Sequence, residues 1–282
     1  MAKNQTRSAP SGKIIALISV VIVLAIIAAL VLVKLNKSTI AVTPTSGLAP
    51  ANVVAAVTQV PQSAIASIGY KTSIPLPTPI DAKGLLLKGG KPELLYMGAD
   101  YCPYCAAQRW ALVVALSHFG TFSNLGETSS SSTDRFPNTQ TFSFHGATFA
   151  SRYISFVGVE LETNIPLASG AGWTPLDKPT AQENNLLATW DKPPYTPTAA
   201  GIPFVDIGNK YVMGGASYSP AILQGLSMAT IAGSLSNTST APSQAILASS
   251  NVITATICKV THNQPANVCS LAYIQKAEKA LK

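Results

Sequence analysis

The sequence predicts one α/β domain, residues 51–282, joined by a stalk to a single N-terminal membrane-spanning helix. Two observations carry this prediction. Near the N-terminus, residues 14–33 form an apolar run of 20 residues with no charge and no proline. After it, segments typical of strands and of helices are mixed, with one strong linker and no internal repeat. A chain of 282 residues is long enough to bury a sizeable core.

The apolar run, Ile14–Val33, has the length of a membrane-spanning helix. At about 1.5 Å per residue it spans roughly 30 Å, the thickness of the hydrocarbon core of a bilayer. The alternative is a cleaved signal peptide, whose apolar region of about 7–15 residues ends at a small-x-small site. Here the run is longer and is followed by the polar segment KLNKST. We therefore expect a retained anchor in contact with membrane lipid.

Charges on the two sides of the anchor predict its orientation. The basic residues before it are Lys3, Arg7 and Lys13, and those after it are Lys34 and Lys37. The excess on the short side favours a cytoplasmic N-terminus. Residues 1–13 are then a cytoplasmic tail, residues 34–50 a stalk and residues 51–282 a domain outside the cytoplasm, where disulfides persist.

Charge also limits the partners of the domain. The formal net charge is +7, but five of the 19 basic residues flank the anchor. From residue 38 onward, 14 basic and 12 acidic residues remain, so the domain carries only +2. A nucleic-acid-binding protein would present a basic face, so this balance argues against nucleic acid as a partner. Two sequons for N-glycosylation, Asn36-Lys37-Ser38 and Asn237-Thr238-Ser239, are compatible with a location outside the cytoplasm.

Local patterns predict the order of elements after the stalk. Two short helices are expected within residues 52–69, with a break at Pro61. Strands are expected where β-branched and aromatic residues gather, at 85–87, 93–98, 141–149 and 153–163, and as a strand–turn–strand unit at 202–215. Helices are expected from the cysteine pair to about residue 119, at 180–190, at 219–235 and in the C-terminal tail.

The segment GADYCPYCAAQRW places Cys102 and Cys105 between a predicted strand and a predicted helix. At a helix N-terminus the first amide N–H groups have no helical partner and the macrodipole is positive, so a thiolate is stabilised there. This lowers the pKa of a cysteine from about 8.5 toward about 3.5–7.5. Pro103 fits the first turn, where no N–H is needed. The pattern predicts thiol–disulfide exchange, in which Cys102 forms a mixed disulfide and Cys105 resolves it.

Two other interpretations of the pair stay open. A CxxC pair is half of a zinc site only if a second close pair or a His cluster completes it. Cys258 and Cys269 are eleven positions apart and the three histidines are scattered, so we expect no metal and no cofactor. The pair could also be a structural disulfide in a binding or assembly factor without turnover. Among the neighbouring residues, Asp100 is expected to cap the helix and Arg109 to be solvated or ion-paired.

The order of strand, CPYC, long helix and then Ile202-Pro203 opening a strand resembles the thioredoxin fold. This resemblance implies a cis peptide bond at Pro203, beside Cys102, and places Pro203 in the catalytic site with the two cysteines. The long gap between Cys105 and Pro203 implies an insertion, as in the larger Dsb-type exported oxidoreductases. The segments YMGADYCPYCAAQRWALVVALSHFG, FPNTQTFSF and FVGVELETN are similar to an archaeal family of membrane-anchored thioredoxin-like proteins of unassigned function.

The chain departs from the thioredoxin pattern around the pair. Tyr101 and the dipeptide Pro103-Tyr104 stand where thioredoxins usually have Trp and Gly-Pro. Tyr96 stands where thioredoxins keep a buried Asp that assists the resolving thiol. A proton acceptor for that thiol is therefore missing or supplied by another part of the chain.

The other two cysteines, Cys258 and Cys269, are expected to form a structural disulfide. On an oxidising side two leftover thiols usually pair, and Asn263 and Pro265 between them favour a turn. The sequence and its resemblance thus predict a membrane-anchored thioredoxin-like domain with an insertion and a C-terminal helical extension. We expect it to act as a thiol–disulfide oxidoreductase on protein thiols or disulfides, with a membrane redox partner as a further candidate. The alternative is a non-enzymatic thioredoxin-like binding or assembly factor.

Overall fold

The computed structural model describes residues 47–281. The predicted tail, anchor and most of the stalk lie outside these residues, so they stay predictions. Between residues 47 and 281, no helix combines the length and the apolarity that crossing a bilayer requires.

A mixed six-stranded sheet forms the centre of the α/β fold. Along one path its strands are β1 (Thr78–Pro79), β12 (Tyr211–Gly214), β11 (Phe204–Ile207), β3 (Lys91–Gly98) and β2 (Leu87–Lys88). On β3, a further strand, β8 (Ser155–Glu160), pairs in parallel, with Leu95 opposite Val157. By contrast, β3 and β11 are antiparallel, with Phe204 opposite Met97, and a tight turn joins β11 to β12. The sheet therefore combines one parallel pair with an antiparallel hairpin.

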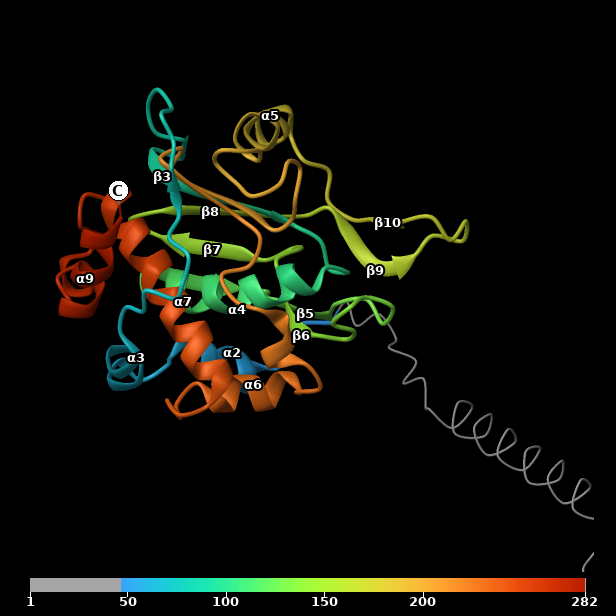
Figure 1. The fold of residues 1–282 in the computed structure, drawn as a ribbon, viewed down its shortest axis with the longest axis horizontal. Coiled ribbons are helices and arrows are strands. Elements are labelled where there is room, and N and C mark those ends of the chain that lie inside the picture. Colours follow the sequence, from blue (N-terminus) through green and yellow to red (C-terminus); the bar gives the residue numbers. More distant parts are fainter. Residues whose placement is uncertain (1–46, 282) are drawn as a thin grey trace, which may run out of the picture. The chain divides into compact units, whose positions relative to one another are not determined.

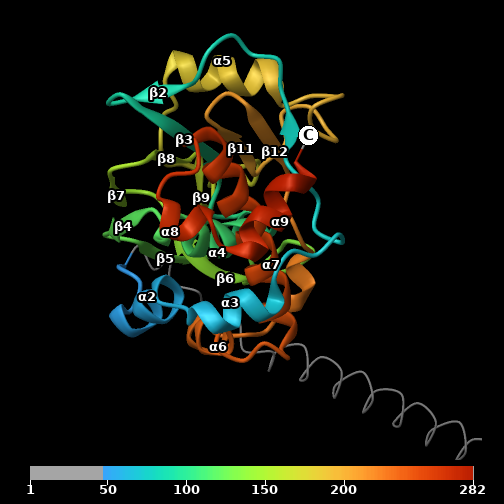
Figure 2. The ribbon, with the colours of Figure 1, turned by 90° about the vertical axis from the view of Figure 1, so that its left-hand side faces the viewer.

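Helices cover both faces of the sheet (Figures 1 and 2). One apolar cluster joins Leu94 and Tyr96 of β3 to α4 (Pro103–Ser117) and α7 (Ala241–Val260). A second cluster joins Leu95 and Met97 to α5 (Ala181–Trp190) on the opposite face. Because successive side chains of a strand point to opposite faces, the unbroken apolar run of β3 supplies both clusters.

Smaller elements surround these layers. The remaining helices are α2 (Ala51–Thr58), α3 (Gln62–Ile68), α6 (Met228–Ser234), α8 (Ala266–Cys269) and α9 (Ala272–Ala280), with a 3₁₀ turn, η1 (Pro220–Leu223). Three two-stranded sheets pair β4 (Gly120–Ser123) with β7 (Thr148–Ser151), β5 (Gly126–Ser129) with β6 (Gln140–Ser143), and β9 (Glu162–Pro166) with β10 (Trp173–Pro175). The break at Pro61 is confirmed, since this residue precedes the first turn of α3. The single helix expected at 219–235 is wrong: the segment divides into η1 and α6 at Gly225, whose φ is 74°.

The predicted disulfide is confirmed. Cys258 near the end of α7 and Cys269 at the end of α8 are joined, and both are buried. His262 and Asn263 adopt positive φ between them, which reverses the chain over a short distance. The disulfide thus ties the C-terminal helices α8 and α9 to the long helix α7.

We expect the double substitution Cys258→Ser, Cys269→Ser to lower the free energy of unfolding and leave Cys102 reactive. In the chain-entropy model a loop this short contributes a little under about 3 kcal/mol. Thermal unfolding measures the loss, and alkylation of Cys102 in the same variant is the control. Unchanged stability together with lost turnover of Cys102 would mean that electrons pass through the second pair.

A second stability prediction concerns Asp206, a fully buried carboxyl in β11. Burial raises the pKa of Asp206 from 3.8 to about 7, although its Oδ1 accepts a hydrogen bond from Asn209 N at 2.6 Å. The native state therefore holds a proton that the unfolded chain has released between about pH 4 and pH 7, so this group lowers stability as pH rises through that range.

We expect Asp206→Asn to remove this pH dependence, because the amide keeps an acceptor for Asn209 N without the charge. At pH 8 the variant should be more stable than the parent by on the order of a few kcal/mol, and near pH 4 the two should be alike. Urea unfolding at both pH values measures the difference. An equal effect of the substitution at the two pH values would contradict this assignment.

Candidate active site

Cys102 occupies the junction between β3 and α4. It is the N-cap of α4, and its Sγ accepts a hydrogen bond from Cys105 N at 3.3 Å. Pro103 follows as the first helical residue. Only 6% of Cys102 is exposed and Cys105 is fully buried; both are free thiols. The helix N-terminus predicted for the pair is confirmed, and the sulfur itself takes the capping role that a Ser or Asp side chain usually fills.

The pKa values of the two thiols are shifted in opposite directions. A hydrogen bond from the Cys105 thiol lowers the pKa of Cys102 below its ordinary value, with help from the Cys105 amide and the nearby Arg109 charge and against the effect of burial. Burial raises the pKa of Cys105 well above its ordinary value. Cys102 is thus suited to be the nucleophile, and Cys105 stays protonated while it stabilises the neighbouring thiolate.

Pro203 lies beside this pair. The Ile202–Pro203 peptide bond is cis, and Cys102 Sγ lies 3.8 Å from the carbonyl oxygen of Ile202. Both the cis bond and the proximity that the thioredoxin resemblance implied are confirmed. A catalytic role of Pro203 stays a prediction.

A buried ion pair lies under the active-site helix. Arg109 of α4 donates from Nε to Glu160 Oε1 at 2.8 Å and from Nη2 to Oε2 at 2.5 Å, and both side chains are fully buried. Asp100 lies 3.6 Å from the same Nη2 atom. The expectation that Arg109 is ion-paired is confirmed, whereas the expected cap at Asp100 is wrong because Cys102 occupies the N-cap position.

The sequence alone does not identify Glu160 as the partner of Arg109. Arg109 is the single charged residue in a helix that is otherwise mostly apolar. This pattern indicates a buried arginine, which needs an acidic partner. Which of the 12 acidic residues that partner is depends on the parallel pairing of β8 with β3, which places Glu160 opposite Gly98.

Tyr96 takes the place of the carboxylate that the thioredoxin pattern leads one to expect. Its ring is fully buried, 5.7 Å from the Arg109 guanidinium, and a Cβ atom on Gly98 would collide with its hydroxyl. Within residues 47–281 that hydroxyl has no hydrogen-bond partner. Burial raises the pKa of Tyr96 well above 10, so it cannot accept a proton as a phenolate at neutral pH.

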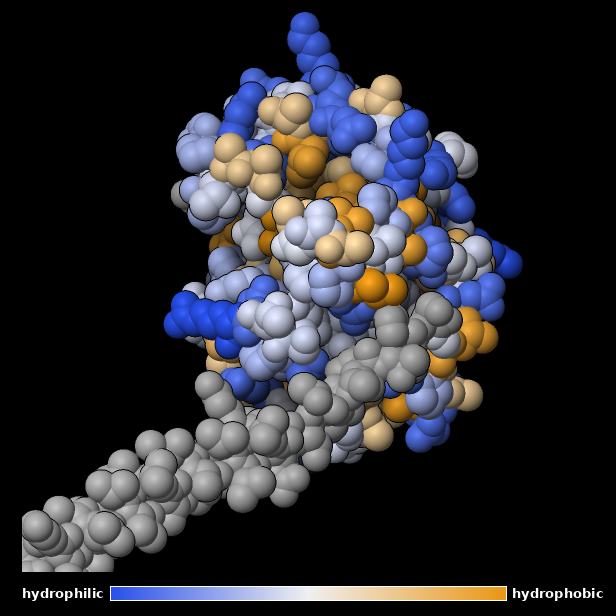
Figure 3. All heavy atoms as spheres, turned by 90° about the vertical axis from the view of Figure 1, so that its right-hand side faces the viewer, coloured by the Kyte–Doolittle hydropathy of each residue, from blue (hydrophilic) through white to orange (hydrophobic). Residues whose placement is uncertain are grey.

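Aromatic side chains border the cysteine pair. Tyr101 stacks on Trp173 of β10 with ring centroids 5.1 Å apart, and Tyr104, 40% exposed, meets the edge of Phe136. The hairpin β9–β10 carries Trp173 and projects from the body in Figure 1. Figure 3, viewed from that side, shows apolar surface among polar side chains. These aromatic side chains give the cysteine pair a partly apolar border.

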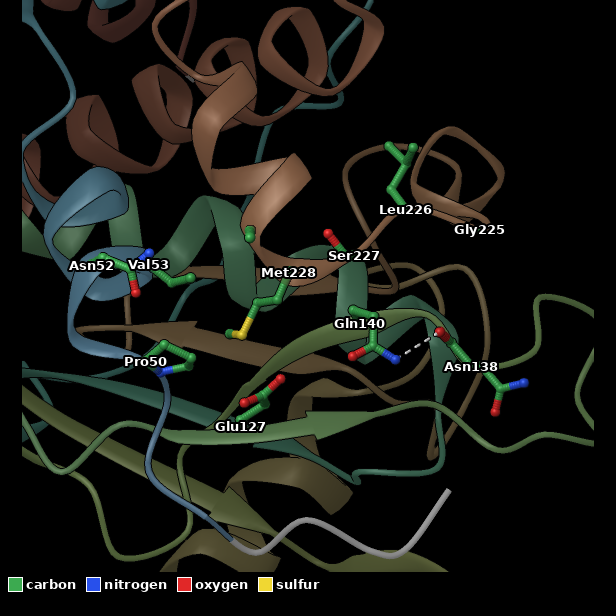
Figure 4. A pocket seen from close by; sticks show the side chains of 11 residues that line it. Pro50, Asn52, Val53, Glu127, Asn138, Gln140, Gly225, Leu226, Ser227 and Met228 are labelled. Atoms are coloured by element: carbon green, nitrogen blue, oxygen red, sulfur yellow. Dashed lines mark hydrogen bonds between the residues drawn. The ribbon is translucent and has the colours of Figure 1, made fainter. Parts of the chain in front are cut away.

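Two hollows are lined in part by the β5–β6 hairpin. One, of about 470 Å³, is lined by polar groups that include Asp100, Glu127, Ser143 and His145. The other, of about 500 Å³, lies between α2, the β5–β6 hairpin and the start of α6; Figure 4 shows Glu127 and Met228 at its walls. Neither is lined by a thiol. In the part of the chain that the structure describes, no three His, Cys, Asp or Glu side chains are grouped as metal ligands.

His118 is the C-cap of α4, at the helix end opposite the cysteines. Burial lowers the pKa of His118 to about 4, so the imidazole is neutral at neutral pH and adds no charge to this helix end.

Comparison with known proteins gives one match. A family model with the description "Domain of unknown function (DUF929)" matches residues 83–171 and 173–259, more than half of the chain. These ranges contain Cys102, Cys105, Arg109, Glu160 and Pro203. No curated protein and no solved structure matches the chain.

Proposed function

The chain belongs to the DUF929 family, and we propose that it is a thiol–disulfide oxidoreductase whose reactive group is the Cys102 thiol. The observation that carries the proposal is the asymmetry of the CPYC pair. Cys102 caps a helix with a lowered pKa, and Cys105 is buried one turn behind it with a raised pKa. A structural disulfide has no need of two thiols with different acidities.

A thioredoxin-like fold is part of the proposal. It is supported by the spatial order β8–β3–β11–β12, with β3 leading into the cysteine helix, β8 parallel to it and Pro203 opening the antiparallel hairpin. Long segments on either side of β8, which form β4 to β7, β9, β10 and α5, are the insertions. The helices α8 and α9 are the C-terminal extension.

The proposed reaction transfers two electrons from the Cys102 and Cys105 thiols to one substrate disulfide. The Cys102 thiolate attacks one substrate sulfur, a mixed disulfide forms, and the other substrate sulfur leaves with the electron pair as a thiolate. The Cys105 sulfur then attacks the Cys102 sulfur, and the bond from Cys102 to the substrate sulfur breaks. That substrate sulfur leaves with the electron pair and takes up the proton that Cys105 loses, so a substrate thiol and a Cys102–Cys105 disulfide remain. Two electrons pass to the substrate, and the reverse sequence oxidises a dithiol.

We further propose that the domain works outside the cytoplasm, anchored by residues 14–33. Support comes from the charge bias around that segment and from the Cys258–Cys269 disulfide, a bond that persists in oxidising compartments. Protein thiols or disulfides in that compartment are then the substrates, and a membrane redox protein would restore the pair.

A trapping experiment tests the redox proposal. In the Cys105→Ala variant the mixed disulfide on Cys102 cannot be resolved, so substrate proteins should accumulate on it in intact cells. Non-reducing electrophoresis should show adducts that a reductant removes. The matched control, Cys102→Ser with Cys105→Ala, should show none. A Cys105→Ala protein that is folded, expressed and free of adducts would favour the binding or assembly factor instead.

A further inference from the structure

The loop between α6 and α7 contains an acceptor motif that the redox proposal does not use. Its sequence, Asn237-Thr238-Ser239, fits Asn-x-Ser/Thr with a residue other than proline in the middle. It is the one such tripeptide within residues 47–281. Two more, at Asn4 and Asn36, lie outside the residues that the structure describes.

The side chain of Asn237 is accessible. Asn237 and Ser239 are both exposed, and the loop lies between the end of α6 at Ser234 and the start of α7 at Ala241 (Figure 1). Its backbone bonds are local: Asn237 N donates to Ser234 O at 2.9 Å, and Thr240 N donates to Asn237 O at 3.3 Å. A transferase can therefore engage this loop without opening the sheet or the apolar clusters.

The hydroxyl that the motif requires already contacts the acceptor amide. Ser239 Oγ donates to Asn237 Oδ1 at 2.7 Å, and Ser239 N donates to the same oxygen at 3.1 Å. Both contacts use Oδ1 and not Nδ2, the atom to which a glycan is attached. The motif is thus exposed and lies outside regular structure, and Ser239 is hydrogen-bonded to the side chain of Asn237.

From this accessibility and arrangement, we propose that Asn237 is a site of N-glycosylation. Its donor belongs to the class of lipid-linked oligosaccharide phosphates. Nδ2 forms a bond to the anomeric carbon of the first sugar as the bond from that carbon to the phosphate oxygen breaks. The lipid phosphate leaves with the electron pair, and the proton lost from Nδ2 passes to a base of the transferase. The inference rests on the proposed location of the domain outside the cytoplasm, but not on the chemistry of Cys102.

The test uses the full chain, produced in a cell that N-glycosylates its exported proteins, with peptide mass spectrometry of all three motifs. We expect the Asn237 peptide to carry a glycan. Ser239→Ala should abolish it and the conservative Ser239→Thr should retain it. Asn267→Gln, which changes an exposed asparagine outside any such motif, should leave the glycan in place.

The three motifs separate the ways in which the proposal can fail. A glycan on Asn36 with an unmodified Asn237 would overturn the proposed modification of Asn237 but support the location of the domain outside the cytoplasm. A glycan on Asn4 alone would overturn both the site and the orientation. An unmodified chain would overturn the site. Trapping on Cys102 is read independently in each case, so a failed glycosylation site does not count against the redox proposal.

Discussion

Reduced protein is expected to be alkylated at Cys102 at pH values where ordinary thiols are nearly inert. The thiolate is the reacting species, and at pH 6.5 a thiol with a pKa of about 8.5 is only about 1% thiolate. The helix N-terminus and the Cys105 thiol lower the pKa of Cys102, so its thiolate fraction stays higher at this pH. We therefore expect Cys102 to react faster in the native protein than in urea at pH 6.5.

The same experiment contains its own controls. In urea both cysteines have ordinary acidities, so Cys102 and Cys105 should be labelled at similar rates. In the native state Cys105 is fully buried and its pKa is raised, so its labelling should be far slower than in urea. Cys102→Ser should remove the fast phase entirely. Equal native rates at the two positions would contradict the assignment of Cys102 as the nucleophile.

The parts of the site that could be predicted from sequence depend on local geometry. The placement of Cys102 at a helix start follows from three adjacent signals, an apolar strand, a proline at the first helical position and an apolar helix. The start of α5 is equally local, because Thr180 and Glu183 form a capping box within four residues. The Cys258–Cys269 pairing needed only the inference that two leftover cysteines on an oxidising side pair with each other.

The parts that could not be predicted depend on contacts between distant segments. Arg109 and Glu160 are 51 positions apart, and only the parallel pairing of β3 with β8 brings them together. The segment 141–149 looked like one strand because aromatic residues run through it. In the structure, a turn with Gly146 at a φ of 70° splits it, and its halves pair with different partners, β5 and β4. The local residue pattern specifies the pairing of such short strands only weakly, so these pairings could not be predicted from the sequence.

Neutralising Glu160 is expected to be the most destabilising single substitution near the site. The buried carboxylate accepts two hydrogen bonds from Arg109 and a third from Phe144 N at 3.1 Å. Glu160→Gln keeps the size of the side chain but leaves the Arg109 guanidinium buried with Asp100 at 3.6 Å as its remaining acidic neighbour. Breaking a buried pair by removing one partner typically costs about 3–5 kcal/mol. For a domain of this size that corresponds to a loss of about 10 °C in Tm.

Two further variants separate lost charge pairing from lost packing. Glu162→Gln makes the same chemical change two residues further on, at a half-exposed side chain, and should alter the Tm by little. Arg109→Met combined with Glu160→Leu removes both charges of the fully buried pair; Asp100, whose side chain is 11% exposed, then loses its basic neighbour. Since replacing a whole buried pair by apolar groups is often neutral, the double variant should be more stable than Glu160→Gln alone. If the double variant is as unstable as Glu160→Gln, the loss of stability comes from altered packing and not from the unpaired guanidinium.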